Sequence, residues 1–586
     1  MKVLPSDVYC SLYVDDFVIF FRSRTINAIE RRLQTAIDKI VKWTTKNGST
    51  VSSNKTVAMH FCKMRSCYDP VLNLNNQPIE FVKEHKFLGL IWDPKLTFLV
   101  HIKYLKNKCV NALNIIRVLS HSKWGSDSKT LIKLFRSLVR SKLDYGCFVY
   151  MTGKESDLEN LNIIHRNGLR LALGAFKSSP KESLYAEANE PPLELRRQEL
   201  AMKYSLKIKS HPENPVYDSI FKLPNRNSYE QSPFLSLGES IDRLFQEAHI
   251  NTNKILNFEI PEKPIWDSEP NDVNFNLSVY DKSTTNPEFF KNTFLSDILP
   301  LYKDYYKIYT DGSKQDNKAA FGVYGESCSV SKRIGDDSSI YTAEVEAIIK
   351  ALKYIEYSPL LQDKDKFIIF SDSKSVLESI CNQTSKNTLI ITLLDYLQKL
   401  RDDDYGIDIK FCWVPSHVGI NGNCKADDEA KKGLEKSLPK KHKFPYTDYI
   451  PKVKEFIKEK WQQRWDYKHQ NERPIKLHNI LPQLKPFYMN GLNRKDEVVI
   501  HRLRIGHTRL THRYLMEDPL KREPVCNFCY LENLTIEHIM VECQHFAVIR
   551  QNTYQINVND MRDLFQKVSL TCIIRFLRAA NLYKEI

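Results

Sequence analysis

The sequence predicts a multidomain chain that combines α+β with α/β units, and three observations lead to this expectation. The chain has 586 residues, several times the length of one ordinary domain, so three or more independently packed units are expected. Residues 303–437 alternate strand-like and helical patterns, the order typical of an α/β unit with a mixed sheet. Helical stretches and a compact Cys/His cluster lie outside that segment.

The N-terminal region combines short strand patterns with one long helical pattern. Residues 11–21, SLYVDDFVIFF, predict two short strands around an acidic turn, a hairpin with the Asp15 and Asp16 carboxylates at its tip. Apolar residues then recur at helical spacing over 26–40, and Gly48 is a suitable stop for this helix. We therefore expect the chain to begin with an α+β unit.

The middle and the end of the chain differ in composition. Residues 101–206 have a helical, basic pattern, whereas residues 207–302 are rich in Pro, Asn and Ser, which predicts a linker with short helical pieces. Beyond the α/β segment, we expect a helical connector over 447–520 and a helical tail over 551–586. No internal repeat is visible.

Basic residues outnumber acidic ones, with 86 Lys and Arg against 71 Asp and Glu. The excess is uneven, because the stretch from His101 to Asp144 holds ten Lys and Arg and two Asp. Such a stretch would attract phosphates, although a basic run alone is more often a solvated helical face. The charge therefore favours nucleic acid as a partner without establishing it.

Cysteine usage and hydropathy bear on the compartment. Of the thirteen cysteines, only Cys526, Cys529 and Cys543 crowd together beside a histidine, which favours reduced cysteines and an intracellular protein of the cytoplasm or nucleus. The apolar run Leu12–Phe21 is interrupted by aspartates and lacks a cleavage site, so we expect no signal peptide and no secretion. No apolar stretch reaches the ~20 residues that a bilayer span requires, so we expect no membrane partner.

Four acids and a histidine in the α/β segment occupy positions suited to chemistry. Asp311 in YTDGS closes an apolar strand before a glycine turn, Asp372 in FSDS closes another, and Glu344 lies on a helix that must pack on the sheet. Asp427 follows in GNCKADDEA, and His417 precedes it on a loop, where it could shuttle protons or help the product leave. Each piece alone is weak, since DGS is usually only a turn.

The chemistry that such acids support is phosphodiester hydrolysis. The reaction needs an activated water and charge relief at the leaving oxygen, which two Mg²⁺ ions ~4 Å apart supply when carboxylate oxygens hold them. Closely placed carboxylates repel one another unless cations lie between them. We therefore expect three of the acids to converge at one sheet edge and the cluster to bind Mg²⁺ or Mn²⁺ and not Zn²⁺.

The ordered set YTDGS, AE, SDS and WVPSHVGINGNCKAD resembles the type 1 ribonuclease H family over residues 303–437. The resemblance implies a ribonuclease H-like mixed sheet with flanking helices, His417 as the loop histidine, and cleavage of the RNA strand of an RNA–DNA hybrid. It also implies that two Mg²⁺ or Mn²⁺ ions are bound by four acids, namely Asp311, Glu344, Asp372 and Asp427. Cys424 departs from the family, whose members often carry an acid there. Because Asp427 remains, we expect at most a less finely adjusted metal site.

Motifs near the N-terminus resemble a second family. Tyr13-Val14-Asp15-Asp16 resembles the Y-x-D-D motif of reverse transcriptases, in which the first aspartate holds the metals and the tyrosine lies near the primer end. GSTVSSNKT, which contains Lys55, and HKFLGLIWD look like later palm motifs and the primer grip of non-LTR retrotransposon polymerases, closest to Jockey and I-like elements. The polymerase remnant would therefore include Tyr13, Asp15, Asp16 and Lys55.

The same resemblance implies a domain order. It gives a partial reverse-transcriptase palm over 1–100 and a helical thumb or connection over 101–206, and it continues through SPKESLYAEANEPPLELRRQELA at 179–201. Nucleotide transfer needs a further palm aspartate on an earlier strand, and only twelve residues precede Tyr13. We therefore expect no RNA-directed DNA synthesis by this chain alone.

The last cluster, Cys526-x2-Cys529-x8-His538-x4-Cys543, lies within 521–550 and offers three thiolates and one imidazole. This closed tetrahedral set suits one structural Zn²⁺, with no position open for catalysis. Similar clusters, preceded by a segment like RLRIGHTRLTHRYL, end many retrotransposon polyproteins. The cations of that segment suggest phosphate contact. They are Arg502, Arg504, His507, Arg509 and Arg513.

Three interpretations of function remain open at this stage. The leading one is the C-terminal part of a retrotransposon polyprotein whose surviving activity is ribonuclease H, with RNA–DNA hybrid, RNA and DNA as partners. The alternative is a catalytically decayed nucleic-acid-binding remnant, and a third is a host protein that has adopted the domain for another purpose. The presence of all four acids favours the first, and the sequence leaves the oligomeric state open.

Overall fold

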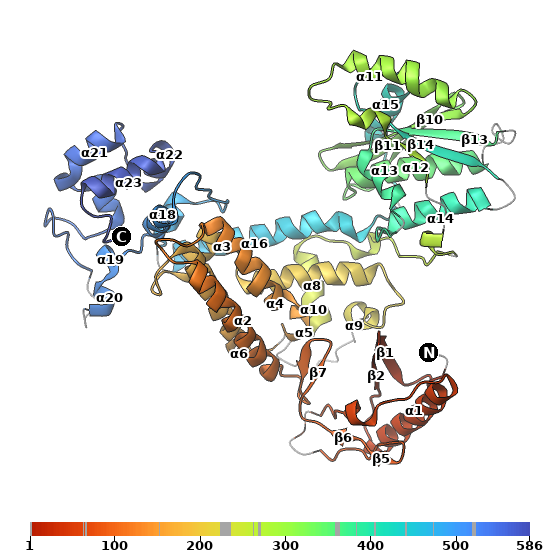
Figure 1. Ribbon diagram of the computed structural model, residues 1–586, viewed down its shortest axis with the longest axis horizontal. Coiled ribbons are helices and arrows are strands. Elements are labelled where there is room, and N and C mark those ends of the chain that lie inside the picture. Colours follow the sequence, from red (N-terminus) through yellow and green to blue (C-terminus); the bar gives the residue numbers. More distant parts are fainter. Residues whose placement is uncertain are drawn as a thin grey trace. The chain divides into compact units, whose positions relative to one another are not determined.

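The computed structural model describes residues 3–586 except 63, 65–66, 152, 223–235, 262, 268–270, 358–363, 383, 403–405, 440–441, 473 and 518–522. The chain divides into two compact units. Unit 1 combines Met1–Arg197 with Trp461–Ile586, and unit 2 is Gln198–Lys460. Figure 1 gives the elements of both units by label. No helix among the described residues combines the length and the apolar composition that a bilayer crossing requires.

Unit 1 begins with the predicted hairpin. Strands β1 (Tyr9–Tyr13) and β2 (Asp16–Phe20) pair antiparallel with Tyr13 opposite Asp16, which confirms the hairpin and its acidic tip. Helix α1 (Ile26–Lys46) follows, and Gly48 has a positive φ of 70° just beyond its end. Short strands then pair as β3 with β6, β4 with β5 and β7 with β8. Their bounds are Val57–Ala58, Asn73–Leu74, Gln77–Pro78, Glu80–Phe81, His85–Phe87 and Leu90–Trp92.

Residues 99–209 are helical, as their periodicity predicts. Gly168 lets two of these helices approach closely, because a Cβ there would lie 2.4 Å from the Phe135 ring. The elements are α2 (Leu99–Leu119), α3 (Ser128–Phe135), η2 (Arg136–Arg140), α4 (Ser141–Asp144), α5 (Cys147–Tyr150), α6 (Glu155–Leu173), α7 (Lys181–Ala188) and α8 (Leu193–Lys209). Helix α8 continues into unit 2.

The C-terminal part of unit 1 has its own apolar core, built around Ile500, Met540, Phe546 and Phe576. Its elements include α17 (Lys476–Ile480), α18 (Arg494–Ile505), α19 (Arg509–His512), α20 (Tyr514–Glu517), η10 (His538–Glu542), η11 (Gln544–Phe546), α21 (Ala547–Tyr554), α22 (Met561–Lys567) and α23 (Leu570–Ala579). Helix α16 (Tyr449–Asn471) connects this part to unit 2.

A six-stranded mixed sheet forms the centre of unit 2, with the strand order β12-β11-β10-β13-β14-β9. The first three strands are antiparallel neighbours, and β10, β13, β14 and β9 run parallel. Their bounds are Cys328–Arg333, Lys318–Gly325, Tyr306–Gln315, Lys366–Ser371, Asp408–Trp413 and Val273–Asn274. This arrangement confirms the mixed sheet with helices that the sequence predicts for this segment.

Both faces of the sheet are covered, because successive strand residues point to opposite sides. Ile308 and Ile369 join one core with α12 (Ile340–Tyr357), α13 (Lys374–Cys381) and α14 (Thr388–Asp402). Tyr309 and Phe370 join a second core with α11 (Pro287–Thr293) and α15 (Asn421–Glu435). Figure 1 shows α11 and α15 on the side of the strands opposite α12, α13 and α14.

Part of the segment predicted as a linker over 207–302 belongs to this sheet. Val273 pairs with Phe411, so β9 extends the sheet beyond β14. Other elements in the segment are α9 (Tyr217–Phe221), α10 (Leu237–Glu247), η3 (Thr252–Lys254), η4 (Ile265–Asp267), η5 (Asn276–Val279), η6 (Phe294–Ile298) and η7 (Leu299–Tyr302). A strand of two residues in an Asn- and Pro-rich stretch leaves no periodic pattern to detect. The bounds of the seven predicted segments stay predictions.

The cysteines differ from the expectation that all are reduced. Cys62 and Cys67 form a disulfide, with a sequence separation of five residues and a Cα–Cα distance of 6.8 Å. The other eleven cysteines are free.

Candidate metal centres

Asp311 lies on the central strand of the sheet. The expected turn after it is wrong, because β10 continues to Gln315 and Gly312 pairs with Phe321. Gly312 is needed for another reason: a Cβ at this position would lie 2.8 Å from the backbone nitrogen of Glu344 and 3.0 Å from its side-chain carboxyl carbon. The glycine therefore lets the first turn of α12 approach β10.

Three of the four predicted acids converge. Glu344 lies in the first turns of α12, and Asp372 directly follows β13, whose neighbour is β10. Carboxylate oxygens of Asp311, Glu344 and Asp372 all lie within 4.8 Å of one another. The Trp413 indole donates to the Asp372 backbone carbonyl at 3.0 Å, which holds the turn after β13.

Burial and mutual repulsion disfavour the charged forms of these acids. Burial raises the pKa of Asp311, and the nearby charges of Asp372 and Asp427 raise it further. Burial and then the charges of Asp311 and Asp372 raise the pKa of Glu344 well above its usual value, and burial raises that of Asp372. Among the described residues, Glu344 Oε2 is buried without a hydrogen-bond partner. These carboxylate oxygens lie close together without enough positive charge to neutralise them. Hard divalent cations bind such oxygens, so this set fits Mg²⁺ or Mn²⁺.

Asp427 and His417 lie beside this cluster in a looser arrangement. Asp427, on α15, places Oδ2 2.8 Å from the Lys431 ammonium and 3.8 Å from His417 Nδ1. His417 is 71% exposed and has a positive φ of 57°, so its side chain projects from a constrained turn. Asp427 is not one of the three acids whose oxygens lie within 4.8 Å of one another.

Two residues at this site escaped sequence reasoning. Lys431 pairs with Asp427 one helical turn away, and the buried Asn423 hydrogen-bonds to Asp372, which lowers the pKa of that carboxyl against the effect of burial. Lys431 could have been found as an i,i+4 partner on a helix. Asn423 gave no signal beyond its place in the loop motif.

The four C-terminal ligand candidates form a compact set in unit 1. Cys526 Sγ lies 4.0 Å from Cys543 Sγ, and Cys529 Sγ lies 3.2 Å from His538 Nε2. Tetrahedral Zn²⁺ with Zn–S bonds of about 2.3 Å separates two sulfurs by roughly 3.8 Å, so the spacing fits zinc.

The backbone around the cluster prepares it for a metal. The Tyr530 N–H donates to the Cys526 carbonyl at 2.9 Å and closes a tight turn between the first two cysteines. The Leu531 amide stabilises the Cys529 thiolate and lowers its pKa to about 6. His538 begins η10, and its Nδ1 lies 3.4 Å from Glu542, a carboxylate that can orient the imidazole.

The arginines predicted to contact phosphate divide into two groups. Arg502 donates to the Gly174 carbonyl at 2.8 Å, and Arg504 is 3% exposed with its Nε 3.0 Å from the Glu187 carboxylate. Both guanidinium groups therefore have partners inside unit 1, and their contact with phosphate stays a prediction. Arg509 and Arg513 are exposed, as the prediction requires.

The polymerase-like residues lie on the surface of unit 1. Tyr13 is 63% exposed, and Asp15, Asp16 and Lys55 are exposed as well. Within the described part of the chain, neither aspartate belongs to a metal-sized cluster of three or more acids, cysteines or histidines.

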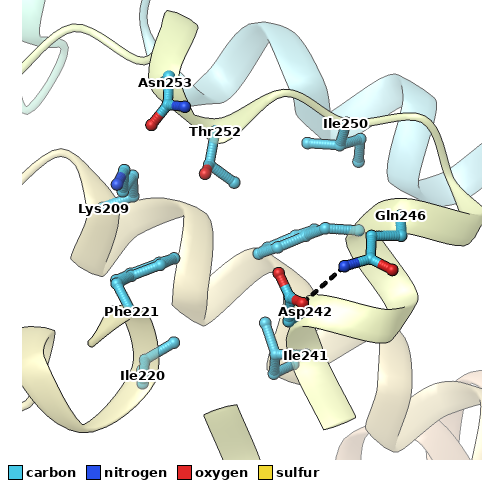
Figure 2. A pocket seen from close by; sticks show the side chains of 10 residues that line it. Lys209, Ile220, Phe221, Ile241, Asp242, Gln246, Ile250, Thr252 and Asn253 are labelled. Atoms are coloured by element: carbon cyan, nitrogen blue, oxygen red, sulfur yellow. Dashed lines mark hydrogen bonds between the residues drawn. The ribbon is translucent and has the colours of Figure 1, made fainter. Parts of the chain in front are cut away.

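Unit 2 also contains a cavity that is lined by residues other than the predicted site residues. It measures about 200 Å³ and lies among α8, α9, α10 and η3 (Figure 2). Its charged groups have internal partners, since Lys209 donates to the Tyr217 hydroxyl at 3.0 Å and Asp242 accepts from Gln246 at 2.7 Å. None of the predicted site residues lines it.

Comparison with known proteins identifies the family of the domain that contains the six-stranded sheet. Residues 303–435 match the family model described as RNase H, so the chain contains a ribonuclease H domain. The RNA-directed DNA polymerase from mobile element jockey of Drosophila funebris is 25% identical over 211 residues, which cover 36% of this chain and 23% of that protein. Human ribonuclease H1 is 29% identical over 161 residues, 24% of this chain and 54% of that protein. The chain is thus distantly related to retrotransposon polyproteins and spans about a quarter of the jockey relative's length.

Solved ribonuclease H structures match a small share of the chain. LC11-RNase H1 in complex with an RNA/DNA hybrid is 20% identical and covers 22% of this chain and 96% of its own, with a TM-score of 0.19. The ribonuclease H1 of Halobacterium salinarum is 18% identical and covers 23% and 99%, with a TM-score of 0.19. The domain assignment therefore rests on the family match and on the sheet itself.

Proposed function

We propose that the ribonuclease H domain cleaves the RNA strand of RNA–DNA hybrids. The observation that carries the proposal is the group of buried Asp311 and Glu344 with half-buried Asp372, whose oxygens lie within 4.8 Å of one another on a ribonuclease H sheet. Packing three carboxylates this closely in a largely buried site is costly without cations, which favours a metal-binding role over a purely structural one. The family match and the human relative support the choice of substrate.

In this proposal Asp311, Glu344, Asp372 and Asp427 would together hold two divalent ions. The ions, when bound, supply an activated water and stabilise the leaving oxygen. Asp427 must then leave the Lys431 ammonium, which is 57% exposed and free to move into solvent. His417, 3.8 Å from Asp427, would transfer a proton at the edge of the site. Selectivity for the hybrid would come from contacts to the RNA 2′-hydroxyls and the deoxyribose strand.

The test uses the full chain, because β9 and residues beyond 437 contribute to this domain. Labelled RNA–DNA hybrid is incubated with Mg²⁺, with Mn²⁺ and with EDTA, beside the Asp372→Asn variant. We expect metal-dependent cleavage that leaves 3′-hydroxyl and 5′-phosphate ends and that the substitution abolishes. A folded chain that binds Mn²⁺ but leaves the hybrid intact would reject the proposal.

The Lys431–Asp427 ion pair favours a second candidate, a nucleic-acid-binding remnant that no longer cleaves. If the ammonium stays on Asp427, that carboxylate cannot hold a metal ion. Salt-sensitive binding of hybrid without cleavage would support this alternative.

For the N-terminal region we propose a partial polymerase palm followed by a helical thumb. The YVDD hairpin and the basic helices after His101 support this interpretation. We further propose that the chain alone does not synthesise DNA, because Asp15 and Asp16 have no third acid within a metal-sized cluster in the part of the chain described here. Extension of a primer on an RNA template would overturn this.

A further inference from the structure

The helix that carries Glu344 begins without an acid of its own. The first N–H groups of an α-helix lack partners, and a common solution is a serine before the helix with Glu or Gln three residues later reaching back to the serine N–H. Ser339 precedes α12, and its hydroxyl accepts from the Thr342 N–H at 3.1 Å. The third residue after it is a threonine, however, which cannot supply the carboxylate.

Asp448, 106 positions downstream of Thr342, supplies the carboxylate instead. Asp448 Oδ2 accepts from the Ser339 N–H at 3.0 Å and from the Thr342 hydroxyl at 2.7 Å. Its Oδ1 accepts from the Ser339 hydroxyl at 3.0 Å. The carboxylate therefore satisfies three donors at the start of α12, and it also places a negative charge at the positive end of the helix dipole. Asp448 lies outside residues 303–435, the part that matches the family model.

The segment that carries Asp448 is itself fixed to unit 2. Phe444 is fully buried, its N–H donates to the Lys254 carbonyl at 3.0 Å, and its carbonyl accepts from the Leu256 N–H at 2.8 Å. The Tyr449 hydroxyl donates to the Asn251 carbonyl at 3.0 Å. A second tie holds the loop before α12, where the Lys452 ammonium donates to Asp337 at 3.3 Å. The carboxylate thus reaches α12 from a segment that several hydrogen bonds and a buried phenylalanine hold in place.

The position of α12 determines that of Glu344, which is two residues beyond Thr342. Because Gly312 already permits the closest approach of this turn to β10, a small shift at the start of α12 would separate Glu344 from Asp311. We propose that Asp448 is a positioning residue of the metal site: its carboxylate fixes the first turn of α12 so that Glu344 faces Asp311 and Asp372. This inference rests on the proposed function, since it assigns Asp448 to the same metal centre.

The test compares Mn²⁺ binding by the full chain, measured by calorimetry, with amide hydrogen exchange at residues 340–344. Asp448→Ala removes the cap, and the milder Asp448→Asn keeps the shape if the first variant does not fold. Glu455→Gln, an exposed acid on α16, is the matched control. Thr342→Glu in the Asp448→Ala background places a capping acid within α12 and should act as a rescue.

We expect Asp448→Ala to weaken Mn²⁺ binding about tenfold or more, as loss of a supporting residue does at other metal sites, and to speed exchange at 340–344. Glu455→Gln should match the wild type, and Thr342→Glu should recover much of the lost affinity. Wild-type Mn²⁺ affinity in a less stable Asp448→Ala protein would reduce Asp448 to an ordinary cap and overturn the inference alone. A wild-type chain that neither binds Mn²⁺ nor cleaves hybrid would overturn the proposed function, and this inference with it.

Discussion

Removing one carboxylate from the acidic cluster is expected to stabilise the metal-free protein while it abolishes cleavage. The substitution is Asp311→Asn, which keeps the shape of a side chain that is 6% exposed and removes its charge. Asp311 has both other acids within 4.8 Å, and its pKa is raised by burial and by Asp372, so its ionised form is the unfavourable one. A neutral amide removes that penalty at neutral pH.

The magnitude follows from the geometry. Two unit charges 4.8 Å apart repel by about 3.5 kcal/mol at an effective dielectric constant of about 20. Because the raised pKa values leave part of the cluster protonated, we expect a gain of about 1–3 kcal/mol in the free energy of unfolding. For a unit of this size that corresponds to a rise of roughly 3–10 °C in the melting temperature.

The assay is thermal unfolding of the full chain at pH 8 with EDTA and with Mg²⁺, beside hybrid cleavage. Asp365→Asn, an exposed acid just before β13, is the control and should leave both unchanged. Mg²⁺ should raise the melting temperature of the wild type and have little effect on Asp311→Asn. An EDTA-treated Asp311→Asn protein that melts at or below the wild-type temperature would refute the reasoning, because the cluster would then not be strained by its own charge.

Four further predictions concern other features. The raised pKa values mean that the folded, metal-free protein holds protons more tightly than the unfolded chain, so its melting temperature should fall as the pH rises from about 5 to 9, and Mg²⁺ should remove the fall. Gly312→Ala places a methyl 2.8 Å from the Glu344 nitrogen and should cost about 1–3 kcal/mol of stability and weaken Mn²⁺ binding in calorimetry. Glu187→Gln leaves the Arg504 guanidinium buried without a carboxylate and should cost about 3–5 kcal/mol in urea unfolding. Cys543→Ser should reduce bound zinc, measured by atomic absorption, from one ion per chain to none.

Each of these has an outcome that contradicts it. A melting temperature that rises with pH in EDTA would show that the carboxylates are not strained, and unchanged Mn²⁺ affinity in Gly312→Ala would mean that α12 has room to move. Glu187→Gln is compared with the exposed Glu194→Gln, and equal urea midpoints would show that Arg504 does not depend on its carboxylate. Wild-type protein without zinc would reject the fourth prediction at once.

The sheet of unit 2 could be predicted because its strands are long and apolar. The segments around Asp311 and Asp372 combine β-branched and aromatic residues with turn residues, so the sequence locates both strands and places Asp372 just after one of them, whereas Asp311 lies inside its strand and not at its end. The role of Gly312 could not be predicted. A glycine after an aspartate predicts a turn from local preference alone, whereas its actual use depends on how closely α12 approaches, which is a long-range property.

In the basic segment before the zinc cluster, local charge predicted a function but could not reveal long-range partners. Arg502 and Arg504 lie among other cations, and charge patterning predicts a phosphate-binding surface. Their partners, Gly174 and Glu187, are more than 300 positions away and become neighbours only when unit 1 assembles. Asp448 is similar, since nothing in its local sequence indicates that it completes the cap of α12.

The pairing of Glu187 with Arg504 has a consequence for synthesis of the chain. Unit 1 is interrupted by unit 2, and 317 positions separate these two residues. At about 5–20 residues per second, a ribosome that has made Glu187 needs roughly 15–60 s to reach its partner. During that time Glu187, which is buried in the folded unit, has no Arg504 to neutralise it. All residues of unit 2 are synthesised before unit 1 is complete. We therefore expect nascent unit 1 to depend on chaperones more than unit 2 does, and a ribosome that stops before position 504 would release unit 1 without the partner of Glu187.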